Sequence, residues 1–75
     1  MAHHYHINVF WSAEDSCWIA DIPDLKPCSA HGETPVEALA EAEQAIGLWL
    51  EYAREKGHPI PEARYRPAIY AMRAA

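Results

Sequence analysis

The sequence predicts an α+β fold in which a small antiparallel sheet packs against a single long helix. Two runs rich in aromatic and β-branched residues predict strands, and a long apolar-periodic run that begins with a capping signal predicts the helix. The expected order is β-β-β-α-β in two layers, because each element must bury its apolar face against the other. A chain of 75 residues is expected to form one domain, residues 1–75, with a thin core.

The first two strands are expected at residues 5–11 and 17–22, joined by the polar segment 12–16, which has the length of a hairpin loop. Alternation along these strands separates their side chains onto two faces. The face that the helix leaves bare should carry Phe10, Cys17 and Ile19. Because an exposed apolar face favours association, a homo-oligomer (dimer or tetramer) or a partner protein is expected to cover it.

Prolines interrupt the chain after the second strand. Neither Pro23 nor Pro27 can donate a backbone hydrogen bond to a sheet, so this stretch should be a turn or a bulged connection. A short third strand can follow at residues 28–31. Gly32 would then allow the backbone to change direction.

The sequence that follows is typical of a helix start. Thr34 suits the N-cap, Pro35 suits the first helical position, and Glu37 completes a capping box. The helix should run over residues 35–56 and end before Gly57, which suits the left-handed residue after a helix. Its apolar stripe is expected to contain Val36, Leu39, Ala40, Ile46, Leu50 and Ala53, and to be widened by Ala42, Ala45 and Trp49.

Beyond the helix, Pro59 and Pro61 prevent an early second helix. The apolar run 68–72 is a possible fourth strand. Such a strand could pair within its own sheet or with the sheet of a partner chain.

The net charge of −5 argues against a nucleic-acid groove or an anionic membrane as the main partner. No apolar run approaches the ~20 residues that cross a bilayer, and the N-terminal segment lacks a secretion signal pattern. A cytoplasmic location is therefore expected. The two cysteines, Cys17 and Cys28, are too few for a secreted disulfide scaffold, so reduced and partly buried thiols are expected.

Four short motifs follow one another in the middle of the chain: Pro23-Asp24-Leu25, Cys28, Gly32-Glu33-Thr34 and Glu37-Ala38-Leu39. In this order and spacing they resemble the HicB-like antitoxin family, in which a hairpin, a Pro-Asp-Leu-Pro-Gly-type turn and a cysteine precede the helix. The resemblance covers residues 5–62 and includes the HPIPE segment after the helix. Lys26-Pro27 departs from the family pattern, which prefers Pro-Gly there.

The resemblance implies the partial RNase H-like N-terminal domain of the family and a role in toxin neutralisation. The implied partner is a HicA-type toxin, a small basic mRNA-cleaving ribonuclease with a double-stranded-RNA-binding fold and a catalytic histidine. The chain leaves no room for the C-terminal DNA-binding module of many family members, so DNA binding is not expected. An acidic protein would be attracted to such a toxin. The candidate contact residues are Glu14, Asp15, Asp21 and Asp24; the alternative is that they are ordinary solvated carboxylates.

Other chemistry is weakly indicated. His4 and His6 share a strand face and could bind a metal, but no carboxylate or thiol completes the set nearby, so neither a metal nor a cofactor is expected. No nucleophile, base and orienting group are assembled, so no enzymatic activity is expected. Two alternatives to the antitoxin remain, a stand-alone oligomeric structural protein and a weak RNA-binding domain.

Overall fold

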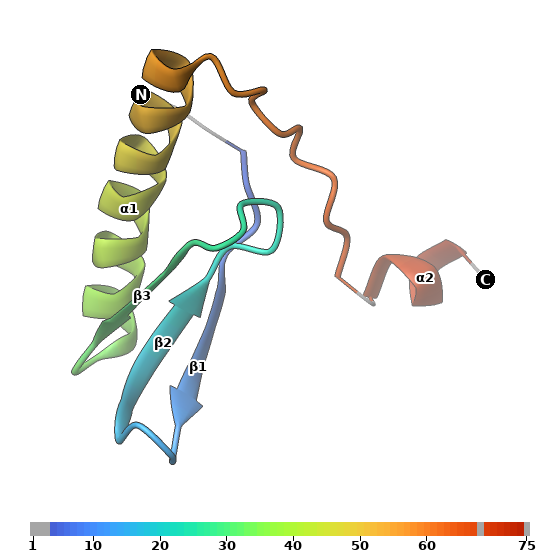
Figure 1. Ribbon diagram of the computed structural model, residues 1–75. Coiled ribbons are helices and arrows are strands. Elements are labelled where there is room, and N and C mark those ends of the chain that lie inside the picture. Colours follow the sequence, from blue (N-terminus) through green and yellow to red (C-terminus); the bar gives the residue numbers. More distant parts are fainter. Residues whose placement is uncertain (1–3, 68, 75) are drawn as a thin grey trace.

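The computed structural model describes residues 4–67 and 69–74. It contains a three-stranded antiparallel sheet of order β1 (Asn8–Ser12), β2 (Cys17–Asp21) and β3 (Ser29–Gly32). The long helix α1 (Pro35–Lys56) lies along one face of this sheet, and the short helix α2 (Ile69–Ala74) lies apart from it (Figure 1). The predicted α+β class, with three strands followed by one long helix, is confirmed.

The hairpin register sorts the strand residues onto two faces. Val9, Ala20 and Ala30 stand side by side across the sheet and belong to the core or pack against it. Phe10 and Ile19 form the adjacent pair on the opposite face. The alternation expected from the sequence therefore determines which side of the sheet meets α1.

The connection between β2 and β3 inserts an additional side chain into the core. The Leu25 N–H donates to the carbonyl oxygen of Ile22 at 3.1 Å, which closes a turn, and the Ile22 N–H donates to the carbonyl oxygen of Cys28 at 3.1 Å. Leu25 and Ile22 are both fully buried. The Lys26–Pro27 peptide bond in this turn is cis. The turn thus fills the core at one end of the sheet.

Both ends of α1 lie where the sequence predicts them. The side-chain oxygen of Thr34 accepts a hydrogen bond from the Glu37 N–H at 3.1 Å, one of the two bonds of the predicted capping box. At the other end Gly57 is left-handed, with φ 70° and ψ 23°. The N–H of His58 donates to the carbonyl oxygen of Ala53 at 2.8 Å, so the final turn is closed as in a glycine-terminated helix.

Gly32 has a different role from the one expected. A Cβ atom built there would lie 2.6 Å from the Ala38 nitrogen and 2.7 Å from the Glu37 Cβ. Such separations are far inside van der Waals contact, so any side chain would push the helix away from β3. Gly32 is therefore required because the backbone of α1 approaches closely, and its φ is not positive.

The close approach at Gly32 also corrects the predicted apolar stripe. Val36 is 76% exposed, and Leu39 and Ala40 are exposed as well, whereas Ala38 is fully buried. Only a small side chain fits where the helix begins so near to β3, so the stripe follows alanines in the first half of α1. The buried helix residues are Ala38, Ala42, Ile46, Leu50 and Ala53.

The predicted strand at 68–72 is wrong. Residues Ile69–Ala74 form α2, while residue 68 lies outside the described residues. The sequence Ala-Met-Arg-Ala within this segment favours a helix, and no described sheet edge lies beside it to supply the hydrogen bonds of a strand. Among the described elements, α2 packs against no other helix or strand.

Candidate partner-binding surface

The hairpin tip places two of the predicted acids in solvent. Glu14 and Asp15 are exposed in the loop between β1 and β2. The Ser12 hydroxyl donates to the Asp15 carboxylate at 2.9 Å, and the Asp15 N–H donates to the same hydroxyl oxygen at 3.2 Å. The loop therefore has a defined conformation, and it presents two negative charges at one end of the molecule.

The other two predicted acids lie at the opposite end of the hairpin. Asp21 is half-buried at the end of β2, and Asp24 is half-buried in the turn that follows. The Asp24 carboxylate accepts hydrogen bonds from the N–H groups of Arg64 and Tyr65, each at 3.0 Å. Asp24 thus holds the C-terminal segment against the body, a role that the sequence did not reveal.

The structure does not bring the four acids together. Each pair is at one end of the five-residue strand β2, so the pairs are roughly 16 Å apart at ~3.3 Å per residue. No group of three or more His, Cys, Asp or Glu side chains able to hold a metal ion occurs among the residues that the structure describes. The acids therefore form two separate negative sites on the surface of the hairpin.

Between these two sites, the face of the sheet opposite α1 is partly apolar. Phe10 is 47% exposed beside its strand partner Ile19, and Cys17 is half-buried near the hairpin loop. At the end of this face, the ring of His6 lies 4.6 Å from the ring of Tyr65, between centroids. The predicted face residues thus share one side of the sheet.

Among the described residues, two groups have a raised pKa, and both keep their protons at neutral pH. Burial, and secondarily the charge of Asp21, raises the pKa of the Cys28 thiol. Burial, with a smaller contribution from Asp24, raises the pKa of the Tyr5 phenol. The phenol donates a hydrogen bond to the carbonyl oxygen of Pro61. A thiol with a raised pKa is a poor nucleophile, so Cys28 acts as a packing residue.

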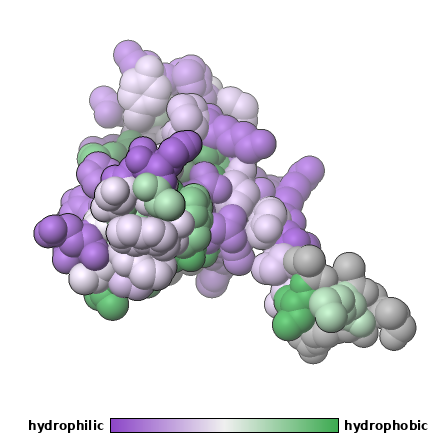
Figure 2. Space-filling view, turned by 90° about the horizontal axis from the view of Figure 1, so that it is seen from below, coloured by the Kyte–Doolittle hydropathy of each residue, from purple (hydrophilic) through white to green (hydrophobic). Residues whose placement is uncertain are grey.

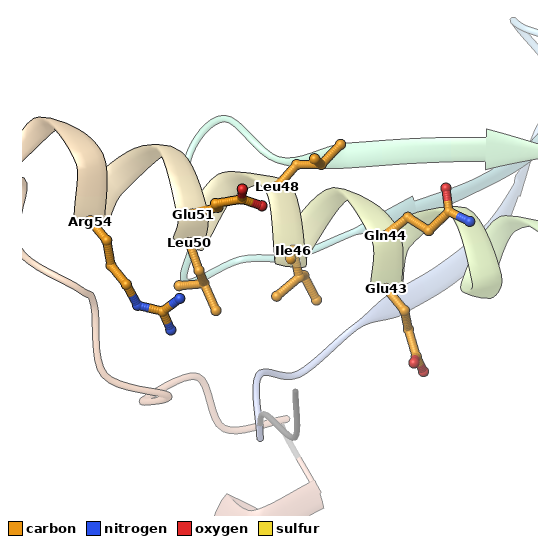
Figure 3. A pocket seen from close by; sticks show the side chains of 8 residues that line it. Glu43, Gln44, Ile46, Leu48, Leu50, Glu51 and Arg54 are labelled. Carbon is orange, nitrogen blue, oxygen red and sulfur yellow. The ribbon is translucent and has the colours of Figure 1, made fainter.

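The outer surface of α1 holds an apolar feature that sequence reasoning missed. Leu48 is 68% exposed, and it projects from a different side of the helix from the buried Ile46 and Leu50 (Figure 3). A hollow of about 540 Å³ adjoins it over Gly47. The available signal in the sequence was that Leu48 and Tyr52 lie four residues apart, and so on the same side of the helix, but outside the predicted apolar stripe.

Charge is divided unevenly along the chain. Residues 1–56 contain three basic and ten acidic side chains, a net charge of −7, whereas residues 57–75 contain three basic and one acidic side chain, a net charge of +2. The exposed acids of α1 add to those of the hairpin; they are Glu37, Glu41, Glu43, Glu51 and Glu55. The sheet and α1 therefore present a strongly negative surface.

Similarity to known proteins places this chain in a family. Neither described helix is long and apolar enough to cross a membrane. Residues 5–72 match the family described as HicB-like antitoxin of bacterial toxin–antitoxin systems. The chain is 35% identical over 71 residues to the UPF0150 protein ssl0259 of Synechocystis sp. (strain ATCC 27184 / PCC 6803 / Kazusa), covering 95% of this chain and 96% of that protein. No solved structure matches. The chain therefore belongs to the HicB-like antitoxin family.

Proposed function

We propose that this protein binds a HicA-type mRNA-cleaving toxin in the cytoplasm and neutralises it by protein–protein contact. The observation that carries the proposal is the family match over residues 5–72, nearly the whole chain. A toxin–antitoxin role follows from the family, and we propose that the protein fulfils it by binding rather than by catalysis. The specific toxin class and the mode of neutralisation are the parts that we propose.

The charge distribution supports this partner. A ribonuclease that binds RNA presents a basic surface, and the net charge of −7 on residues 1–56 would attract it and speed the encounter. The carboxylates at the hairpin tip, Glu14 and Asp15, are exposed, and they lie at the opposite end of β2 from Asp24, which binds the C-terminal segment. In our proposal they occupy positions where RNA phosphates would bind the toxin, and Asp21 and Asp24 form a second contact at the other end of the hairpin.

Co-expression tests the proposal. A short open reading frame beside this one that encodes a basic HicA-like protein would be expressed alone and together with this chain. We expect growth arrest by the toxin alone, rescue by the pair, and co-purification as one complex. If the two proteins elute separately and the toxin still arrests growth, this protein is not its antitoxin.

A pair of charge reversals then locates the contact. Glu14→Lys places a positive charge at the hairpin tip, and Glu55→Lys makes the same change on an exposed site near the end of α1. We expect Glu14→Lys to weaken toxin binding about tenfold and the control far less, because only charges that face the partner matter strongly. Calorimetric titration at two salt concentrations measures both effects. If both variants lost the same affinity for the toxin, the hairpin tip would not be part of the interface.

A further inference from the structure

Helix α2 has an apolar surface that no other described helix or strand of its own chain covers. It exposes Ile69 and Met72, the latter at 76%, and contacts none of the other described elements. Figure 2 shows this segment as a separate lobe with an apolar surface. The radius of gyration is 13.6 Å, whereas a compact domain of this length has about 11 Å. A six-residue helix has too few hydrogen bonds to persist alone in water, so another surface must stabilise it.

An apolar groove of matching character lies between α1 and the edge strand β3. Ala45, Trp49 and Tyr52 line it from the helix, Cys28 lines it from the segment before β3, and its volume is about 500 Å³. Leu48 lines this groove and also the two adjoining hollows along α1. The Leu48 groove is the name used below for this surface.

Charge complementarity connects the groove with the segment. The hollow that continues the Leu48 groove along β3 is lined by Glu33, Glu37 and Glu41, and by no lysine or arginine among the described residues. The segment 57–75 has a net charge of +2, and the sequence places Arg66 and Arg73 on either side of the apolar residues of α2. A cationic, apolar segment thus complements an acidic, apolar groove.

We propose that the Leu48 groove binds the C-terminal segment, centred on α2, of a second copy of this chain. In its own chain α2 extends away from the body, so it cannot cover its own groove (Figure 1). Two copies that exchange their segments reciprocally bury both apolar surfaces in one closed, two-fold symmetric dimer. Gly47 lines the adjoining hollow beside Leu48, and a Cβ atom added there would meet nothing beyond its own stretch of helix within 4 Å, so the helix surface is open at this point.

Sedimentation equilibrium on the full chain, without any toxin, tests this exchange. Leu48→Glu places a charge in the groove, Met72→Glu places one on α2, and Val36→Glu changes an equally exposed α1 residue outside the groove. We expect a wild-type dimer whose dissociation constant rises at least tenfold in each of the first two variants and less than threefold in the third. Circular dichroism should show that the 22-residue helix α1 stays folded in all three, because all three positions are exposed. The first two variants should lose no more helix than the six residues of α2.

Mixing the two damaged variants identifies the occupant. The intact groove of the Met72→Glu chain can take the intact segment of the Leu48→Glu chain, so the mixture should dimerise more tightly than either variant alone. A wild-type monomer overturns the proposal. So does a dimer that Leu48→Glu weakens but Met72→Glu does not, which would show another occupant, and so does an absence of rescue in the mixture.

Discussion

Two glycines, one just before α1 and one in its middle, stand in opposite surroundings. Around Gly32 the chain is crowded, since a Cβ there would lie 2.6 Å from the helix backbone. Around Gly47, in the middle of α1, a Cβ would meet nothing within 4 Å. The first glycine is explained by packing inside the chain. The second has no such explanation, although a glycine inside a helix costs about 1 kcal/mol relative to alanine.

The two glycines therefore mark two kinds of surface, one that is already packed within the chain and one that is exposed to solvent. The junction of β3 and α1 is filled by small residues that fit only one arrangement. The outer surface of α1 around Leu48, like the exposed side of α2, lacks a partner element among the described residues. Substitutions at the two kinds of position should therefore have opposite consequences for stability.

Among these substitutions, Gly32→Ala should lower the free energy of unfolding the most. The added methyl group forces α1 away from β3, and overpacking of this kind costs about 2–3 kcal/mol. Urea denaturation followed by circular dichroism measures the loss. An unchanged midpoint would mean that the junction yields easily, and the contrast with Gly47 would then disappear.

Asp24→Ala should cause the next largest loss of stability, and the loss should be confined to the C-terminal segment that this residue binds. The carboxylate is the acceptor for the N–H groups of Arg64 and Tyr65, and removing it should cost about 1–2 kcal/mol and release the C-terminal segment. Amide hydrogen exchange should speed up at Arg64 and Tyr65 while the sheet amides change little. Asp15→Ala, in the hairpin loop, is the matched control and should leave the segment protected.

Gly47→Ala should stabilise the isolated chain by about 0.5–1 kcal/mol, since alanine favours the helix and the methyl group meets no neighbour. Thermal unfolding at a concentration low enough to prevent association measures the gain. A loss of stability would show that the helix surface here is already occupied within the chain.

The smallest change in stability is expected from alkaline pH, through the thiol of Cys28, which lines the Leu48 groove. Cys28 binds its proton more tightly in the folded state, because burial raises its pKa. Its contribution to stability is therefore complete below the unfolded pKa of about 8.5 and is lost as the pH rises through the folded value. Denaturation midpoints measured from pH 7 to pH 10 should fall less steeply in Cys28→Ala than in the wild type.

The sequence was most informative where a signal is local. Thr34, Pro35 and Gly57 mark both ends of α1 because capping depends on residues next to one another. The strand faces followed from alternation for the same reason. The stripe was misplaced at Val36 because periodicity could not show that Gly32 brings the helix backbone within contact of β3. The segment 68–72 was misassigned because a strand needs a neighbouring edge, and no described strand lies there.

The sequence by itself determined the fold class, the ends of the long helix and the acidic character of the surface, since these depend on near neighbours or on composition. Only the tertiary structure decided that Asp24 binds the backbone of residues 64 and 65, that the four hairpin acids form two separate sites, and that Leu48 and α2 remain uncovered by the described elements. Each of these depends on which distant parts of the chain meet. That meeting is set by the packing of α1 on the sheet, and no single segment encodes it.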